Sequence, residues 1–134
     1  MRKHPRMLTE AGVSPARYAE LRDICRQYRE MRRDVERARH GHFGRFELKS
    51  RRDPTGNTAA AVASMPQARR CRIIEQCAGD VAGRIIGRAI LKSVTDGDAY
   101  ARLRPPCGER QFYQLRLAFF AELDRRLWEM EWGE

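Results

Sequence analysis

Apolar side chains recur at intervals of three and four residues along most of this chain, and this periodicity limits the fold more than any other feature. Near the N-terminus the pattern comprises Tyr18, Leu21, Ile24, Cys25, Tyr28, Met31 and Val35. Near the C-terminus it comprises Phe112, Leu115, Phe119, Leu123 and Leu127, widened by Phe120 and Trp128. A period of 3.6 residues brings such side chains to one face of a helix. We therefore expect an all-α protein whose helices pack through these faces.

The first helix has a clear start signal. Ser14 can accept a hydrogen bond as N-cap, and Pro15 suits the first helical position, where no N–H is needed. The apolar pattern then continues to about Arg39, which predicts one amphipathic helix. The segment 40–57, which holds several glycines and Pro54, is expected to be a loop or linker.

A long helical segment is expected over residues 66–93, after a second Ser and Pro pair at Ser64 and Pro66. Gly79, Gly83 and Gly87 lie within it at a spacing of four. On one continuous helix they would form a face that another helix could approach closely. The alternative is a break near Gly79–Asp80, and the sequence does not choose between the two.

The C-terminal third has the order expected for a helix-turn-helix unit, over about residues 80–128. A turn at 95–97 leads to a short helix, Asp98–Leu103, with Asp98 as N-cap. Two prolines make 104–108 a rigid turn. A last helix then runs from about Gly108 to Trp128. In such a unit the N-terminal residues of the last helix enter the major groove.

The face opposite the apolar stripe of the last helix supplies the candidate DNA-binding residues. Arginine pairs well with guanine edges and glutamine with adenine, because both form bidentate hydrogen bonds there. Preceding arginines would contact the phosphate backbone. The candidates are Arg102, Arg104, Glu109, Arg110, Gln111, Tyr113, Gln114 and Arg116.

The charge also favours a polyanionic partner, for which we expect double-stranded DNA. The formal net charge is +9, and the pI is near 10.1. Residues 1–57 carry +7 of this and are expected to form a basic N-terminal helix and linker; residues 58–134 carry +2 and are expected to form a helical domain that includes the helix-turn-helix. Cations near phosphates release condensed counterions. Nearly all of the cations are arginines, a bias that genome base composition alone can produce.

Nothing in the sequence has the pattern of a catalytic or metal site, so we expect no enzyme and no cofactor. His4, His40 and His42 lie in the expected tail and linker. Cys25 and Cys77 are expected to be small buried hydrophobes rather than zinc ligands. With no apolar run long enough for a signal peptide or a membrane span, we expect a cytoplasmic protein without membrane contact.

Several segments resemble a known family. They are 93–97 (SVTDG), Tyr100, 106–108 (PCG), 111–113 (QFY) and 119–120 (FF), together with 18–28 and 72–75 nearer the N-terminus. The chain resembles small proteins of phages and integrated elements of Gram-positive gut bacteria, similar in turn to late-transcription activators of the ArpU/RinA type. The resemblance implies a helix-turn-helix like that of sigma-factor region 4. It also implies promoter DNA as partner, with a contact to RNA polymerase. The proline-filled turn at 104–107 is shorter than in sigma-like units.

Two other functions stay open from the sequence. The same helices could serve a phage packaging or assembly component, or an adaptor, that binds protein partners; a homodimer is compatible with either function. Such an adaptor should expose an apolar patch on the first helix. Alternatively, an arginine-rich helix can bind RNA, and this chain has Arg22, Arg26, Arg29, Arg33 and Arg37 on its first helix.

Overall fold

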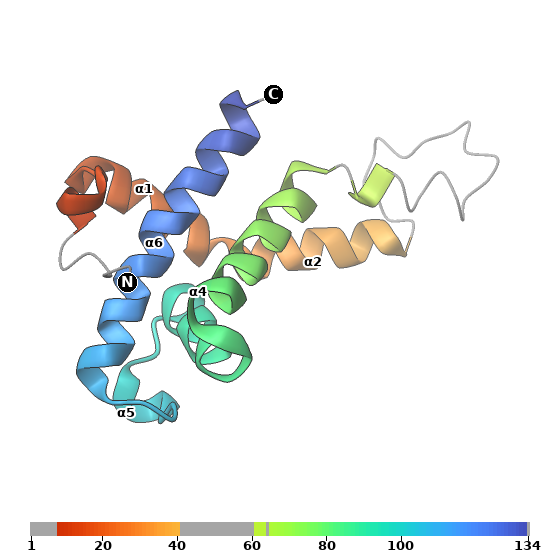
Figure 1. Cartoon of the computed structure of the whole chain (residues 1–134). Coiled ribbons are helices and arrows are strands. Elements are labelled where there is room, and N and C mark those ends of the chain that lie inside the picture. The colour runs from red at the N-terminus through yellow and green to blue at the C-terminus, as the bar shows by residue number, and fades with distance from the viewer. Residues whose placement is uncertain (1–7, 41–60, 64, 134) are drawn as a thin grey trace, which may run out of the picture. The chain divides into compact units, whose positions relative to one another are not determined.

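A computed structural model describes residues 8–40, 61–63 and 65–133, and these residues form helices joined by short turns (Figure 1). The elements are the 3-10 helix η1 (Leu8–Ala11) and the α-helices α1 (Pro15–Arg26), α2 (Tyr28–Arg39), α4 (Pro66–Asp96), α5 (Tyr100–Leu103) and α6 (Glu109–Trp132). No strand occurs within those ranges. The all-α class expected from the periodicity is therefore confirmed for the described part of the chain.

The chain divides into two compact units. Unit 1 comprises residues 1–27 and 73–134, and unit 2 comprises residues 28–72, so that α4 begins in unit 2 and continues in unit 1. The expected domain boundary between residues 57 and 58 lies outside the described residues. So does the expected linker 40–57, apart from residue 40.

Helix α1 starts where its capping residues predict. Ser14 has extended backbone angles, and its side-chain oxygen accepts a hydrogen bond from the Arg17 N–H at 3.1 Å. The expectation of one helix continuing to Arg39 is wrong, because Gln27 separates α1 from α2. The Gln27 N–H is shared between the carbonyls of Asp23 and Ile24, each at 3.2 Å, which loosens the regular helical ladder at this residue.

The middle segment bends sharply at Gly83 rather than near Gly79–Asp80. Gly83 has φ 84° and ψ 175°, a conformation open essentially to glycine alone. The two pieces of α4 then come close at Gly87, where a Cβ atom would lie 2.6 Å from the carbonyl oxygen of Ala78. The glycine spacing thus marks both a break and a close approach, with different glycines responsible for each.

The core of unit 1 is built on α6. All five residues of its expected inward stripe are buried, and so is Phe120. Phe120 meets the ring of Tyr18 from α1 edge-on, with ring centroids 5.1 Å apart. The expectation for Trp128 is wrong, because its side chain is 60% exposed. From α1 and α4 the core receives Leu21, Cys25, Ile74, Cys77, Ile90 and Val94.

Ion pairs join the helices of unit 1 at the edge of this core. Nε of Arg17 on α1 lies 2.5 Å from a carboxylate oxygen of Asp124 on α6. Arg126 of α6 reaches Asp80 of α4 at 2.8 Å. Both pairs are partly exposed, so they help to define how the helices pack more than they stabilise the fold.

Unit 2 has a smaller core. Val35 and Ala38 of α2 pack with Val62 and Ala68, and Met65 covers the cluster. The Arg72 guanidinium donates to the carbonyl oxygen of Ala63 at 3.3 Å. No helix in the described part of the chain has the length and apolar character needed to cross a membrane.

Candidate nucleic-acid interface

The turn between α5 and α6 is held by hydrogen bonds among its own residues. The Tyr100 hydroxyl donates to the carbonyl oxygen of Cys107 at 2.5 Å. The Arg104 N–H donates to the Tyr100 carbonyl at 2.9 Å, and the Cys107 N–H donates to that of Pro105 at 2.8 Å. Arg104 adopts φ 48°, in the left-handed region. These contacts fix the start of α6 relative to α5.

Aromatic packing continues from the turn into α6. The ring centroids of Tyr100 and the buried Phe112 lie 5.6 Å apart. The Tyr113 hydroxyl oxygen accepts a hydrogen bond from the Tyr100 N–H at 3.4 Å. Tyr113 remains 37% exposed. This candidate residue therefore supports the turn and at the same time offers part of its ring to solvent.

Five of the candidate residues are exposed near the end of α5 and the start of α6. Figure 1 shows these two segments next to each other. The five residues are Arg102, Arg104, Glu109, Arg110 and Gln111. The Arg102 side chain is 82% exposed. Its Nε forms a long ion pair, at 4.0 Å, with a carboxylate oxygen of Asp98. Gly108 is the N-cap of α6 and offers no side-chain acceptor, so the first-turn amides remain available to an external acceptor.

The next turns of α6 line an open hollow of about 440 Å³. Its lining includes Arg110, Tyr113, Gln114, Arg116 and Leu117. Arg110 and Gln114 are four residues apart, so their side chains project from the same side of the helix. The structure thus brings an exposed guanidinium and a half-buried amide group to one surface.

Arg116 differs from the other candidates because unit 1 itself uses its side chain. Its Nε donates to the buried Ser93 hydroxyl at 3.1 Å, and its guanidinium lies 5.2 Å from the centre of the Phe120 ring. These contacts attach α6 to the end of α4. The sequence contains no local signal for this, because Ser93 and Arg116 are distant along the chain.

The cysteines of the core are buried as expected. Cys25 and Cys77 are free thiols, and burial raises the pKa of each to about 12. The Cys77 thiol donates to the carbonyl oxygen of Phe119 at 3.4 Å. Within the described residues, no three His, Cys, Asp or Glu side chains gather as a metal site would need.

Three exposed side chains outside the candidate set were not anticipated from the sequence. Ile85 is 64% exposed, and Trp128 and Trp132 are 60% and 69% exposed. Of the three, only Trp128 was expected on an inward face, and the packing of the helices shows that all of them face solvent.

Comparisons with known proteins give no relative from which a role could be transferred. No protein-family model, no curated protein and no solved structure matches this chain.

Proposed function

We propose that the chain is a sequence-specific DNA-binding transcriptional regulator of a phage or mobile element, and not an enzyme. In this proposal α5 and α6 act as a helix-turn-helix, and the N-terminal half of α6 enters the major groove of double-stranded DNA. The resemblance described above adds RNA polymerase as a further partner at the promoter.

One observation carries the proposal. Three exposed arginines flank an α6 N-terminus that has no side-chain cap: Arg102 and Arg104 precede it, and Arg110 lies in its first turn. Backbone amides at a helix N-terminus favour phosphate, and so do arginines. The hydrogen-bonded turn keeps these groups in a constant arrangement, so that little ordering would be lost on binding.

The environments of the candidate residues suggest different roles for them. Arg110 and Gln114 share one side of α6, with Gln111 exposed nearby, and these three would contact base edges. Arg102 and Arg104 would contact phosphates and set the register. Arg116 is a positioning residue, because its guanidinium is occupied by Ser93 and Phe120.

The test is fluorescence anisotropy with labelled duplexes tiled across the DNA that flanks the gene, at two salt concentrations. We expect the wild type to prefer one duplex over its scrambled version by at least about tenfold. Each bidentate base contact is worth about 1–3 kcal/mol, so the Arg110→Ala/Gln114→Ala variant should lose that preference. An Arg102→Ala variant should weaken binding to every duplex. It should also reduce the slope of log affinity against log salt concentration by about one.

A matched control removes cationic charge far along the sequence from this surface. Arg33 and Arg37 are exposed on α2, and an Arg33→Ala/Arg37→Ala variant should keep the preference for the chosen duplex. Sequence-specific recognition by α6 would be refuted if the protein bound all duplexes equally and if moderate salt abolished that binding.

A protein-interaction module is the second candidate function, and the exposure of Trp128 and Trp132 favours it. The apolar face of α1 is packed, with Leu21 and Cys25 buried, so the patch expected there for an adaptor is not exposed. Two more strongly exposed aromatic side chains, Trp128 and Trp132, lie instead at the other end of α6. If the duplex experiment fails while partner binding depends on these tryptophans, the adaptor function replaces the DNA-binding one.

A further inference from the structure

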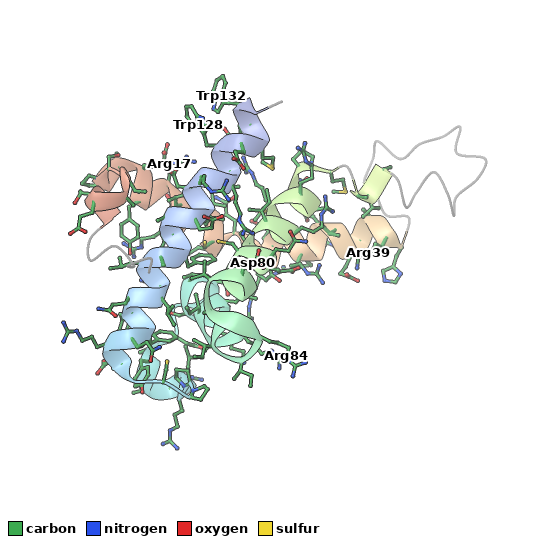
Figure 2. The ribbon with its side chains drawn as sticks, viewed as in Figure 1. Arg17, Arg39, Asp80, Arg84, Trp128 and Trp132 are labelled. Atoms are coloured by element: carbon green, nitrogen blue, oxygen red, sulfur yellow. The ribbon has the colours of Figure 1, made fainter. Side chains whose placement is uncertain are left out.

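The C-terminal end of α6 carries two tryptophans that the unit leaves in solvent. Trp128 and Trp132 are 60% and 69% exposed, and their ring centroids lie 5.6 Å apart. Figure 2 shows both side chains projecting at the tip of the helix. Exposed tryptophan pairs are unusual on monomers and are enriched at protein interfaces. We call Trp128, Glu129, Glu131 and Trp132 the aromatic end.

The charge of the aromatic end limits what can cover it. Residues 127–134 hold three glutamates and no cation, in a chain whose net charge is +9. Glu131 is exposed, and Glu129 is 61% exposed and pairs with Arg125 at 2.8 Å. Nucleic acid and anionic lipid would be repelled by these carboxylates. A suitable partner presents an apolar side chain bordered by cations.

A surface of that kind lies on α4 of the same unit. Ile85 is 64% exposed directly after the bend at Gly83, and Arg84 and Arg88 beside it are both exposed. Ile85 and Arg88 are three residues apart and Arg84 and Arg88 four, so the side chains are neighbours on the helix. Within the described chain neither arginine has an ion-pair partner. We call Arg84, Ile85 and Arg88 the basic patch.

The two surfaces cannot meet within one copy. Both belong to unit 1, where Figure 2 shows Arg84 well separated from Trp128 and Trp132. The Arg126–Asp80 ion pair and the contact of Cys77 with Phe119 hold α4 against α6 between them. A contact between the two surfaces therefore requires a second molecule.

We propose that two copies of this chain associate through the aromatic end of one copy and the basic patch of the other. The tryptophans would cover Ile85, while Glu129 and Glu131 face Arg84 and Arg88. Contact between two aromatic ends is disfavoured, because it would bring four glutamates together. A two-fold axis would let a pair of copies make the contact twice and close the dimer. This inference is independent of DNA binding by the other end of α6.

The first measurement is sedimentation velocity of the full chain without DNA, from about 1 µM to about 500 µM. We expect a concentration-dependent dimer. The chain has only two tryptophans, and both are in the aromatic end, so fluorescence reports on this surface alone. Their emission should shift to shorter wavelength over the same concentration range as dimerisation, since the contact removes water from the rings.

Charge reversal then identifies the two surfaces. An Arg84→Glu/Arg88→Glu variant and a Glu129→Lys/Glu131→Lys variant should each dimerise at least about tenfold more weakly than the wild type. Mixing the two should restore association, because both contacts in the mixed dimer join opposite charges. A Trp128→Ala/Trp132→Ala variant should remain monomeric and keep its helical circular dichroism, as both side chains are exposed.

The control is Arg33→Glu/Arg37→Glu, which changes the charge equally at another surface and should dimerise as the wild type does. A chain that stays monomeric at the highest concentration overturns the proposal. So does a dimer that survives the tryptophan substitutions, or a mixture of the two reversed variants that fails to associate.

Discussion

Replacing Gly87 with alanine tests the bend in α4 most directly. The added Cβ atom would lie 2.6 Å from the carbonyl oxygen of Ala78 and 3.2 Å from the Cα atom of Gly79. Those neighbours are backbone atoms, so no side chain can rotate away. The two pieces of α4 would have to separate by several tenths of an ångström.

The expected magnitude comes from two opposing terms. Alanine gains about 1 kcal/mol over glycine inside a helix, whereas overpacking a tight contact costs about 1–3 kcal/mol and occasionally more. Because the overlap is with backbone, we expect the upper end of that cost and a net destabilisation of about 2 kcal/mol. For a chain of this size that lowers Tm by roughly 6–10 °C.

Gly79→Ala provides the matched control, because it makes the same chemical change on the same helix. A Cβ atom at Gly79 would meet open space, so the variant should gain up to about 1 kcal/mol from helix propensity alone. Both variants are compared by urea unfolding followed by circular dichroism at 222 nm. If Gly87→Ala proves as stable as Gly79→Ala, the close approach of the two pieces of α4 is refuted.

Three further predictions concern the backbone, an ion pair and the thiols. Arg104→Gly should relieve the left-handed backbone and raise stability by about 0.5–1 kcal/mol, while it weakens DNA binding; a lower Tm in calorimetry would contradict this. Hydrogen bonds and charges from Arg125 and Arg126 lower the pKa of Glu122 to about 2, so its stabilisation is complete above its ordinary pKa of 4.5 and is lost as the pH falls toward 2. Glu122→Gln should therefore cost about 1 kcal/mol at pH 7, since solvent screens the pair, and progressively less as the pH falls toward 2; equal unfolding curves at pH 7 would argue against the pairing. Iodoacetamide followed by mass spectrometry should label Cys107 well before the three buried cysteines, and fast labelling of Cys25 would show that its thiol is not buried.

The periodicity of the chain was sufficient to predict that it is helical and to predict most of the core of unit 1, but it did not predict the separation of α1 from α2 at Gln27. The inward stripe of α6 follows from a spacing that any helix obeys, whatever lies opposite. The start of α1 depends on Ser14 and Pro15, whose hydrogen bonding is local. The order of helix and turn from α4 to α6 likewise comes from glycine and proline, which act on the backbone where they stand.

The candidate site was predictable in part. That Arg110 and Gln111 lie at the start of α6 followed from the turn before them. The use of Arg116 by Ser93 and Phe120 did not, because a long cation on a helix surface has the same local pattern whether it contacts solvent or the protein. The hydrogen bond that the Tyr113 hydroxyl accepts from the Tyr100 N–H was likewise not predictable, because Tyr100 belongs to another helix.

The sequence by itself determined that this chain is helical and which faces of α1 and α6 turn inward, because those properties depend on neighbours three and four residues away. Tertiary structure decided that Gly83, among three evenly spaced glycines, takes the positive φ, since only the packing of the two pieces of α4 distinguishes them. It also decided that Trp128 and Trp132 stay outside. An apolar side chain is buried only where another element covers it, and in the described structure these two rings stay exposed although the neighbouring Leu127 is buried.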